Sequence, residues 1–393
     1  MQKQLFSLIN LRSFFLALVP LFGIYLILPG LTLDVLVLFI LLLVEILFKR
    51  DIVINYKILL LFLVLFFCNV ISYLFSSTST QSFFINNSIQ LTSFAVLLCY
   101  YMQQPVNSVF IKTLHYVGVF ASLFVCLQFV AFWGFGQSIT LFLPLNTSVE
   151  DLDLLVSIGY GRPNSIFLEP AHYSIFILPL FFYSLINKKH LLSSIYFLGL
   201  LLSTSTTGFA ISIIILLYHF VFQKRNIILL LIVGVLVVPL LFFEDFFSLI
   251  FESNLDKLGA DSIGENDRLL GTFPLILKMD SFSWIFGLGY NQMSDFFRNQ
   301  GVFVDNYSNS YLMSFFSFGF IGILTLISYL VSLVKIKSPK GYFLIFILIL
   351  ASDQILFNRN FFYLVSCIYF LNNVTTDDMS IVEGEIKNED VVY

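Results

Sequence analysis

Residues 191–222 read LLSSIYFLGLLLSTSTTGFAISIIILLYHFVF. Two apolar runs, 191–205 and 208–222, are separated there by a short polar turn. A transmembrane helix needs roughly 20 predominantly apolar residues, with a lower limit of about 17, so both runs are near the short end of that range. The pattern predicts two antiparallel membrane helices joined by a tight turn.

The whole chain has the same apolar character. Of its 393 residues, 59% are hydrophobic, 18% are aromatic and 11% are charged, whereas an ordinary soluble domain has about 25% charged residues. The composition excludes a soluble globular protein and predicts a polytopic membrane protein. Because the net charge is −4, we expect no basic face and no nucleic-acid partner. The four cysteines form no CxxC pair or Cys/His cluster, so we expect no metal and no cofactor.

Apolar runs bounded by charges or turn residues recur along the chain and give about twelve candidate spans. We therefore predict an all-α fold, a polytopic transmembrane helical bundle over residues 1–374, in which the first run is retained rather than cleaved. Residues 375–393 are rich in Asp and Glu and are predicted to be a disordered cytoplasmic tail. The runs fall near residues 12–29, 31–48, 56–75, 86–102, 109–134, 171–186, 191–205, 208–222, 226–243, 309–334, 341–357 and 361–374.

The distribution of basic residues predicts the orientation of the chain. If the N-terminus is cytoplasmic, 14 of the 20 Lys and Arg residues lie in cytoplasmic segments, as the positive-inside rule requires. Both termini are then cytoplasmic, and the two long connections, 136–170 and 244–308, lie outside. Long loops are usually functional in a chain whose other connections are short, so we expect the site to face outward. The outer segments hold four Arg and two Lys, and arginine suits bidentate recognition of phosphate.

The densest group of polar residues is the stretch 161–174, GRPNSIFLEPAHYS. Pro170 stands where a helix can begin, and Glu169 just before it lies near the positive helix N-terminus. Two interpretations stay open. In the first, Glu169 caps the helix and pairs with Arg162, while His172 reaches the membrane interface. In the second, the stretch is an active site with Glu169 or His172 as general base, because ionisable residues at this depth are costly and by default functional.

The same stretch resembles the signature of Wzy-type polysaccharide polymerases, in the superfamily of O-antigen polymerases and ligases. Residues 162–173 are followed by a span and a cytoplasmic Lys pair, and further pieces are similar to the family's outward Ser/Thr-Gly turn and large periplasmic loop. The resemblance covers roughly residues 155–330. The further pieces are 203–208 (STSTTG), 266–268 (NDR), 287–290 (GLGY) and 306–311 (NYSNSY), with Gly319 and Gly322 in the following span.

The resemblance implies an integral-membrane glycosyltransferase with a GT-C-like bundle in the bacterial cytoplasmic (inner) membrane. It implies that the enzyme joins oligosaccharide repeat units carried on undecaprenyl pyrophosphate, at the outer face of that membrane and without a metal. The implied partners are a lipid-linked oligosaccharide donor and acceptor, membrane lipid, and a chain-length regulator and flippase of the same pathway. The implied product is a surface polysaccharide.

The candidate site residues follow from the stretch and the resemblance together. We place His172 slightly ahead of Glu169 as general base, because an unperturbed imidazole titrates near pH 6.5. Related ligases favour a histidine in the large periplasmic loop, but residues 244–308 contain none. Arg162 and Arg268 are predicted to hold the diphosphate. The predicted substrate-binding set also contains Asn164, Tyr173, Asn306 and Asn309.

Several polar residues keep a structural alternative at this point. Asn306 and Asn309 are equally suited to cap the helix that begins near residue 309. Glu45 is predicted to be an interface charge near a basic helix end, and Asp353 is predicted to pair with Arg359.

Two other functions compete with the polymerase. A ligase of the same superfamily shares Arg162 and Arg268 but transfers the glycan to a different acceptor. A transporter predicts an internal repeat and charges near the bilayer midplane, and the sequence shows neither. The Gly-Leu-Gly at 287–289 lacks the rest of a dinucleotide-binding fingerprint and is predicted to be a turn.

Overall fold

The structure is a computed structural model that describes residues 2–28, 31–48, 53–75, 81–141, 162–223, 273–300 and 309–371. Several sequence predictions lie outside the described residues and stay predictions. They are the apolar run 226–243, most of the two long connections, the tail 375–393, and the site residues Arg268 and Asn306.

Helices dominate the described part of the chain, as the apolar runs predict. Each predicted run that falls within the described ranges overlaps a helix. The all-α prediction omits one feature there, an antiparallel hairpin of β1 (Leu26–Leu28) and β2 (Leu31–Thr32). The helices are α1 (Gln2–Phe22), α2 (Leu33–Phe48), α3 (Tyr56–Phe75), α4 (Gln81–Tyr101), α5 (Ser108–Phe135), α7 (Pro170–Ile186), α8 (His190–Leu202), α9 (Thr206–Gln223), α14 (Phe273–Ile276), α15 (Ser281–Phe286), α16 (Met293–Asn299), α17 (Ser310–Val334), α18 (Lys340–Ser352) and α19 (Arg359–Phe370).

Within the described ranges, three helices are long and apolar enough to cross a membrane: α3, α5 and α17. They have 20, 28 and 25 residues. Since each helical residue adds about 1.5 Å, each reaches the roughly 30 Å of a bilayer's hydrocarbon core. Other helices, such as α7 and α8, are apolar but shorter. The fold is therefore that of a helical protein with membrane-capable helices, and the number of about twelve spans stays a prediction.

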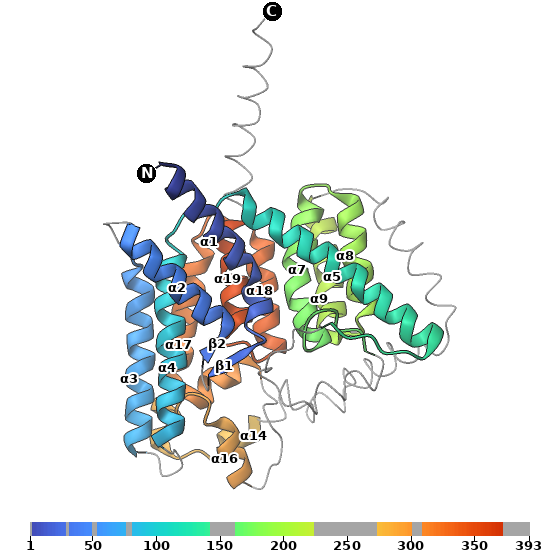
Figure 1. Cartoon of the computed structure of the whole chain (residues 1–393). Helices are drawn as coiled ribbons and strands as arrows, with labels where there is room; N and C mark the ends of the chain where they lie inside the picture. The colour runs from blue at the N-terminus through green and yellow to red at the C-terminus, as the bar shows by residue number, and fades with distance from the viewer. Residues whose placement is uncertain are drawn as a thin grey trace, which may run out of the picture.

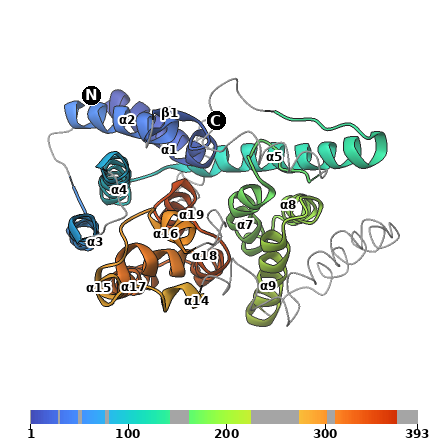
Figure 2. The same ribbon diagram turned by 90° about the horizontal axis from the view of Figure 1, so that it is seen from below.

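The helices form two groups joined by a central pair. Figure 1 shows α3, α4 and α17 on one side and α7, α8 and α9 on the other, with α18 and α19 between them. α18 contacts α17, α7 and α9, while α19 contacts α1, α7 and α18. Figure 2, seen from below, shows α1 and α5 running along one face of both groups, where α5 packs against α1 and α8.

One end of the bundle gathers the starts of several helices. The first residues of α7, α9, α17 and α19 lie at the lower end of Figure 1, together with the hairpin of β1 and β2. We call this the hairpin end. It is the end that carries the candidate site.

Toward the opposite end, a charged pair lies inside the bundle. Arg12 of α1 donates to both carboxylate oxygens of Glu45 of α2 at 3.0 Å, and both side chains have 0% exposure. Tyr100 donates a further hydrogen bond to Glu45, and Arg12 also donates to the carbonyl of Pro105. The prediction of an interface charge at Glu45 is wrong, because α1 places a buried cation directly against it.

The helix α17 is broken at Gly319, and a loop pairs with the residues before the break. Gly319 has φ 62° and ψ −152°, a conformation that glycine adopts readily. The backbone N–H groups of Leu288 and Gly289 donate to the carbonyls of Phe316 and Ser317, at 2.7 and 3.0 Å. The loop between α15 and α16 is therefore hydrogen-bonded to the bent part of α17.

Polar side chains of α3 and α4 hold the same loop from its other side. Ser72 donates to the carbonyl of Gly287 at 3.0 Å, and Asn87 donates to the carbonyl of Tyr290 at 2.7 Å. Asn69 accepts from the backbone N–H of Tyr290 at 2.9 Å. These contacts satisfy backbone groups that are costly to bury unpaired. They agree with the prediction of a turn at 287–289.

Replacing Gly319 with alanine is expected to lower the free energy of unfolding by about 3 kcal/mol, because backbone strain and overpacking each cost about 1–3 kcal/mol. A Cβ there would lie 2.5 Å from the carbonyl carbon of Ile285. Denaturant unfolding in detergent measures the loss. Gly136→Ala is the matched control: φ is 67° and a Cβ meets nothing within 4 Å, so we expect a loss of about 1 kcal/mol. Equal losses in the two variants would contradict the packing argument.

Candidate functional site

The hairpin end contains the stretch that the sequence singles out. α7 begins at Pro170, and Glu169 is its N-cap residue, with an extended backbone and no hydrogen bond from its side chain to the helix. The predicted helix start is confirmed, whereas capping by the Glu169 carboxylate is not what the structure shows. His172 lies in the first turn of α7 and is half-buried, as is Glu169. Both candidate bases are therefore at the start of one helix.

Arg162 contacts the turn between α8 and α9. Its Nε and Nη2 donate to the hydroxyl and to the carbonyl of Thr204, at 3.4 and 3.3 Å. Thr204 has φ 54°, a left-handed conformation that is uncommon for a β-branched residue. The Ser/Thr-rich turn and the arginine, 42 residues apart in the sequence, thus meet at the hairpin end.

The turn itself is fastened to α7. Ser205 accepts from the backbone N–H of Gly208 at 3.2 Å and so caps the start of α9. A Cβ on Gly208 would lie 2.2 Å from the hydroxyl oxygen of Ser174 in α7. Glycine at this position therefore allows α7 and α9 to approach closely. As a result, the turn that Arg162 contacts lies next to the first turn of α7.

Two predicted substrate-binding residues are packed inside the protein. Asn164 is 2% exposed, donates to the carbonyl of Leu168 and accepts from Gln128, both at 3.2 Å. Tyr173 is 0% exposed and donates to the hydroxyl of Ser122 at 2.9 Å. A substrate reaches neither side chain in this conformation. Both have packing roles here, and we leave them out of the proposed site.

Asn309 is the N-cap residue of α17, and its side chain accepts from the backbone N–H of Leu312 at 2.9 Å. This contact confirms the capping alternative for Asn309. The next residue, Ser310, donates to the carbonyl of Asp353 at 2.7 Å and accepts from the N–H of Ile355 at 2.9 Å. The start of α17 is thereby tied to the connection between α18 and α19.

The structure adds Arg359, which the sequence analysis does not place in the site. Arg359 is the first residue of α19, and its guanidinium donates to the carbonyl of Gly23. The charges of Asp34 and Glu169 both act on it electrostatically. Asp34 is 5% exposed and accepts from the hydroxyl of Thr32. We call Asp34, Glu169 and Arg359 the hairpin-end cluster.

The sequence holds only a weak signal for this cluster. Asp34 and Arg359 both stand near the end of an apolar run, where an ionisable residue is expensive and by default functional. Spacing along the chain predicts Asp353 as the partner of Arg359. It cannot reveal that the charges on α2 and at the start of α7 act on Arg359, because the helices come near one another only when they pack.

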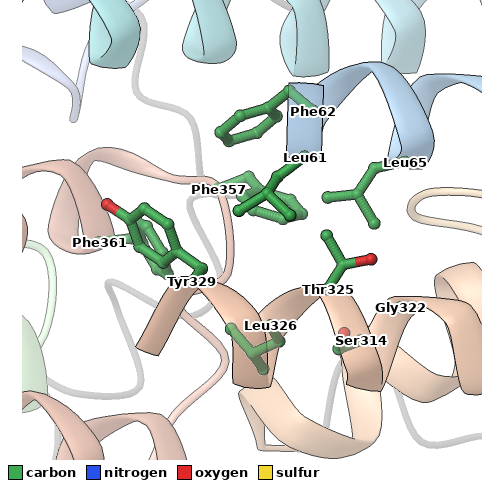
Figure 3. A pocket seen from close by; sticks show the side chains of 10 residues that line it. All are labelled: Leu61, Phe62, Leu65, Ser314, Gly322, Thr325, Leu326, Tyr329, Phe357 and Phe361. Atoms are coloured by element: carbon green, nitrogen blue, oxygen red, sulfur yellow. The ribbon is translucent and has the colours of Figure 1, made fainter. Parts of the chain in front are cut away.

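A separate hollow lies between α3 and α17, and Figure 3 shows the ten side chains that line it. Its cavity volume is about 20 Å³. The lining carries no charged side chain, and its polar side chains are the hydroxyls of Ser314, Thr325 and Tyr329. The hairpin-end cluster is therefore the candidate site. The hollow is lined by Leu61, Phe62, Leu65, Ser314, Gly322, Thr325, Leu326, Tyr329, Phe357 and Phe361.

Comparison with known proteins gives no assignment for this chain. No protein-family model, no curated protein and no solved structure matches it. A functional assignment must therefore come from the residues of the chain itself.

Proposed function

We propose that this protein is an integral-membrane glycosyltransferase that polymerises lipid-linked oligosaccharide repeat units into a surface polysaccharide. One observation carries the proposal. Asp34, Glu169 and Arg359 lie at one end of a mostly apolar helical bundle, and Arg162 lies at the same end. Ionisable side chains in such surroundings are costly and are by default functional. The same end holds residues 162–173, the stretch that resembles the Wzy-type signature.

The proposal includes an orientation in the bacterial cytoplasmic membrane. The bundle has about twelve spans, the hairpin end faces outside, and both termini are cytoplasmic; the excess of basic residues in the other connections supports this arrangement. A membrane-impermeant thiol reagent is expected to label a cysteine placed at Ser262 and to leave one placed at Lys188 unlabelled. The reverse pattern would overturn the orientation.

The proposed reaction is a displacement at the anomeric carbon of the donor. A hydroxyl oxygen of the acceptor sugar forms a bond to that carbon, and the bond between the carbon and the diphosphate oxygen breaks. The electron pair leaves with undecaprenyl diphosphate, and the hydroxyl proton passes to the general base. Arg162, together with Arg268 outside the described residues, neutralises the leaving diphosphate.

The direct test is a bacterial strain that lacks the protein. It is expected to make surface glycans that carry a single repeat unit, because units are still built and attached but not joined. Loss of a ligase or of a transporter does not give that product. Electrophoresis of the surface glycans, with a complemented strain as control, measures the outcome. Full-length polymer in the deletion strain would refute the proposal.

A further inference from the structure

Thr204 lies between two residues that cap helices, in the turn that joins α8 and α9. On one side, Ser203 is the C-cap residue of α8, and its hydroxyl donates to the carbonyl of Leu200 at 2.9 Å. On the other side, the hydroxyl of Ser205 accepts from the backbone N–H of Gly208 at 3.2 Å. Because the chain changes direction between these two caps, Thr204 takes the left-handed conformation, with φ 54°.

Glycine, rather than threonine, is the residue that usually follows a helix C-cap in this conformation, with asparagine next. Threonine is an expensive choice there, because the Cβ of a left-handed L-residue comes too close to the following carbonyl oxygen. Non-glycine residues held in this conformation cluster at functional sites, where the surrounding structure maintains them. The question is therefore what the Thr204 side chain contacts that glycine would not.

Two atoms of Thr204 accept hydrogen bonds from the guanidinium of Arg162. Nε donates to the hydroxyl oxygen Oγ1 at 3.4 Å, and Nη2 donates to the carbonyl oxygen at 3.3 Å. Thr204 is 8% exposed, whereas Arg162 is half-buried. The guanidinium is planar and rigid, so two contacts with one buried residue constrain the direction of its plane. Glycine at this position would keep the carbonyl contact and lose the hydroxyl contact.

We propose that Thr204 is a positioning residue for Arg162. Its hydroxyl and carbonyl fix the plane of the guanidinium, so that Arg162 presents a rigid fork to the leaving diphosphate. The inference rests on the proposed function, in which Arg162 neutralises that diphosphate. Gly208 brings the turn against Ser174 of α7, two residues after His172, so the oriented arginine belongs to the same end of the bundle as the candidate base. Thr204 acts through Arg162 and does not itself contact the substrate.

Three substitutions separate the hydroxyl from the backbone conformation. Thr204→Val keeps the branched shape and removes the acceptor. It is expected to lower kcat by about 10- to 100-fold, because misplacing a reacting group by about 1 Å costs up to about 100-fold. KM is expected to change by less than about threefold, since the diphosphate gains its charge in the transition state. Thr204→Ser restores the hydroxyl and is expected to stay within about threefold of the wild-type kcat. Thr204→Gly lacks the hydroxyl and is expected to be as slow as Thr204→Val. The assay uses the full chain in membranes with lipid-linked repeat units, and rates are compared per folded molecule.

Thermal unfolding of the same proteins in detergent tests a purely structural role. Thr204→Gly relieves the left-handed conformation, so its unfolding midpoint is expected to equal or exceed that of the wild type although its kcat falls. Lys188→Gly is the matched control, because Lys188 is exposed and has φ 56° in the turn between α7 and α8. It is expected to keep both the midpoint and the wild-type kcat. Wild-type kcat in Thr204→Gly, or a lower kcat together with a lower midpoint, would overturn the inference.

A double variant tests whether Thr204 acts through the arginine. Thr204→Val combined with Arg162→Ala is expected to be no slower than Arg162→Ala alone. If the two losses multiply, Thr204 acts on something other than Arg162, and the inference is wrong.

Inorganic pyrophosphate gives a readout that needs no polymer, because it carries the charge of the leaving group. It is expected to raise the unfolding midpoint of the wild-type and Lys188→Gly proteins, since a ligand that binds the folded state stabilises it according to its affinity. The rise is expected to be smaller in Thr204→Val. An equal rise in wild type and Thr204→Val, or no rise in either, would contradict the inference, whereas absence of polymer from the wild-type chain would refute the proposed function.

Discussion

Replacing His172 with glutamine is expected to slow polymerisation by about 100- to 10,000-fold, the usual contribution of a general base. Glutamine keeps the capacity to form hydrogen bonds at the start of α7 but cannot accept the proton of the attacking hydroxyl. Glu169→Gln keeps the shape of the side chain and loses its charge, and is expected to cost less. The rate of polymer formation from lipid-linked repeat units, per folded molecule, measures both.

The comparison has two outcomes that would change the assignment. Polymer of wild-type length from His172→Gln, with none from Glu169→Gln, would make Glu169 the base. Full activity in both variants would remove the start of α7 from the site and leave it a helix N-terminus with a packing role.

The second large effect is expected at the buried pair of Arg12 and Glu45. Glu45→Gln leaves the Arg12 charge buried without its carboxylate, and breaking a buried ion pair in this way costs about 3–5 kcal/mol. Nη1 of Arg12 lies 3.0 Å from both carboxylate oxygens of Glu45, and both side chains have 0% exposure, so this is a buried ion pair. Denaturant unfolding in detergent is expected to show the loss, together with a lower amount of protein in the membrane.

Two further variants make that prediction specific. The double variant Arg12→Met/Glu45→Met removes both charges and is expected to recover most of the stability, because apolar replacements of buried pairs are often neutral. Lys57→Gln removes an exposed charge on α3 and is expected to change stability by less than about 0.5 kcal/mol. A double variant as unstable as Glu45→Gln would show that hydrogen bonding, such as that from Tyr100, matters more than the charge balance.

The helices of this protein can be predicted from the sequence, whereas the contacts between helices cannot. A run of apolar residues must satisfy its own backbone groups in a bilayer, and the helix does so locally. The start of α7 at Pro170 can also be predicted from neighbouring residues, since Pro suits the first turn of a helix and Glu169 precedes it. Arg12 and Glu45, by contrast, are 33 residues apart and on different helices. Nothing in either apolar run specifies the other partner.

The same difference between local and long-range contacts applies to the candidate site. The sequence places Glu169, His172 and Arg162 in one stretch, and the structure keeps them at one end of the bundle. Arg359 reaches that end through Gly23, 336 residues earlier in the chain, a separation over which no spacing rule operates. For Tyr173, the sequence predicts a role in substrate binding that the structure does not support. The residue belongs to the same stretch, but its helix face points inward and its hydroxyl donates to Ser122.

The break in α17 has a consequence for how that helix takes its shape. In a straight helix, the carbonyls of Phe316 and Ser317 bond to N–H groups four residues ahead. Here they accept from Leu288 and Gly289 of the preceding loop, which is itself held by α3 and α4. Two carbonyls freed in hydrocarbon would cost several kcal/mol each. As an isolated segment, α17 would therefore stay straight. It acquires its bend only when the loop docks against it.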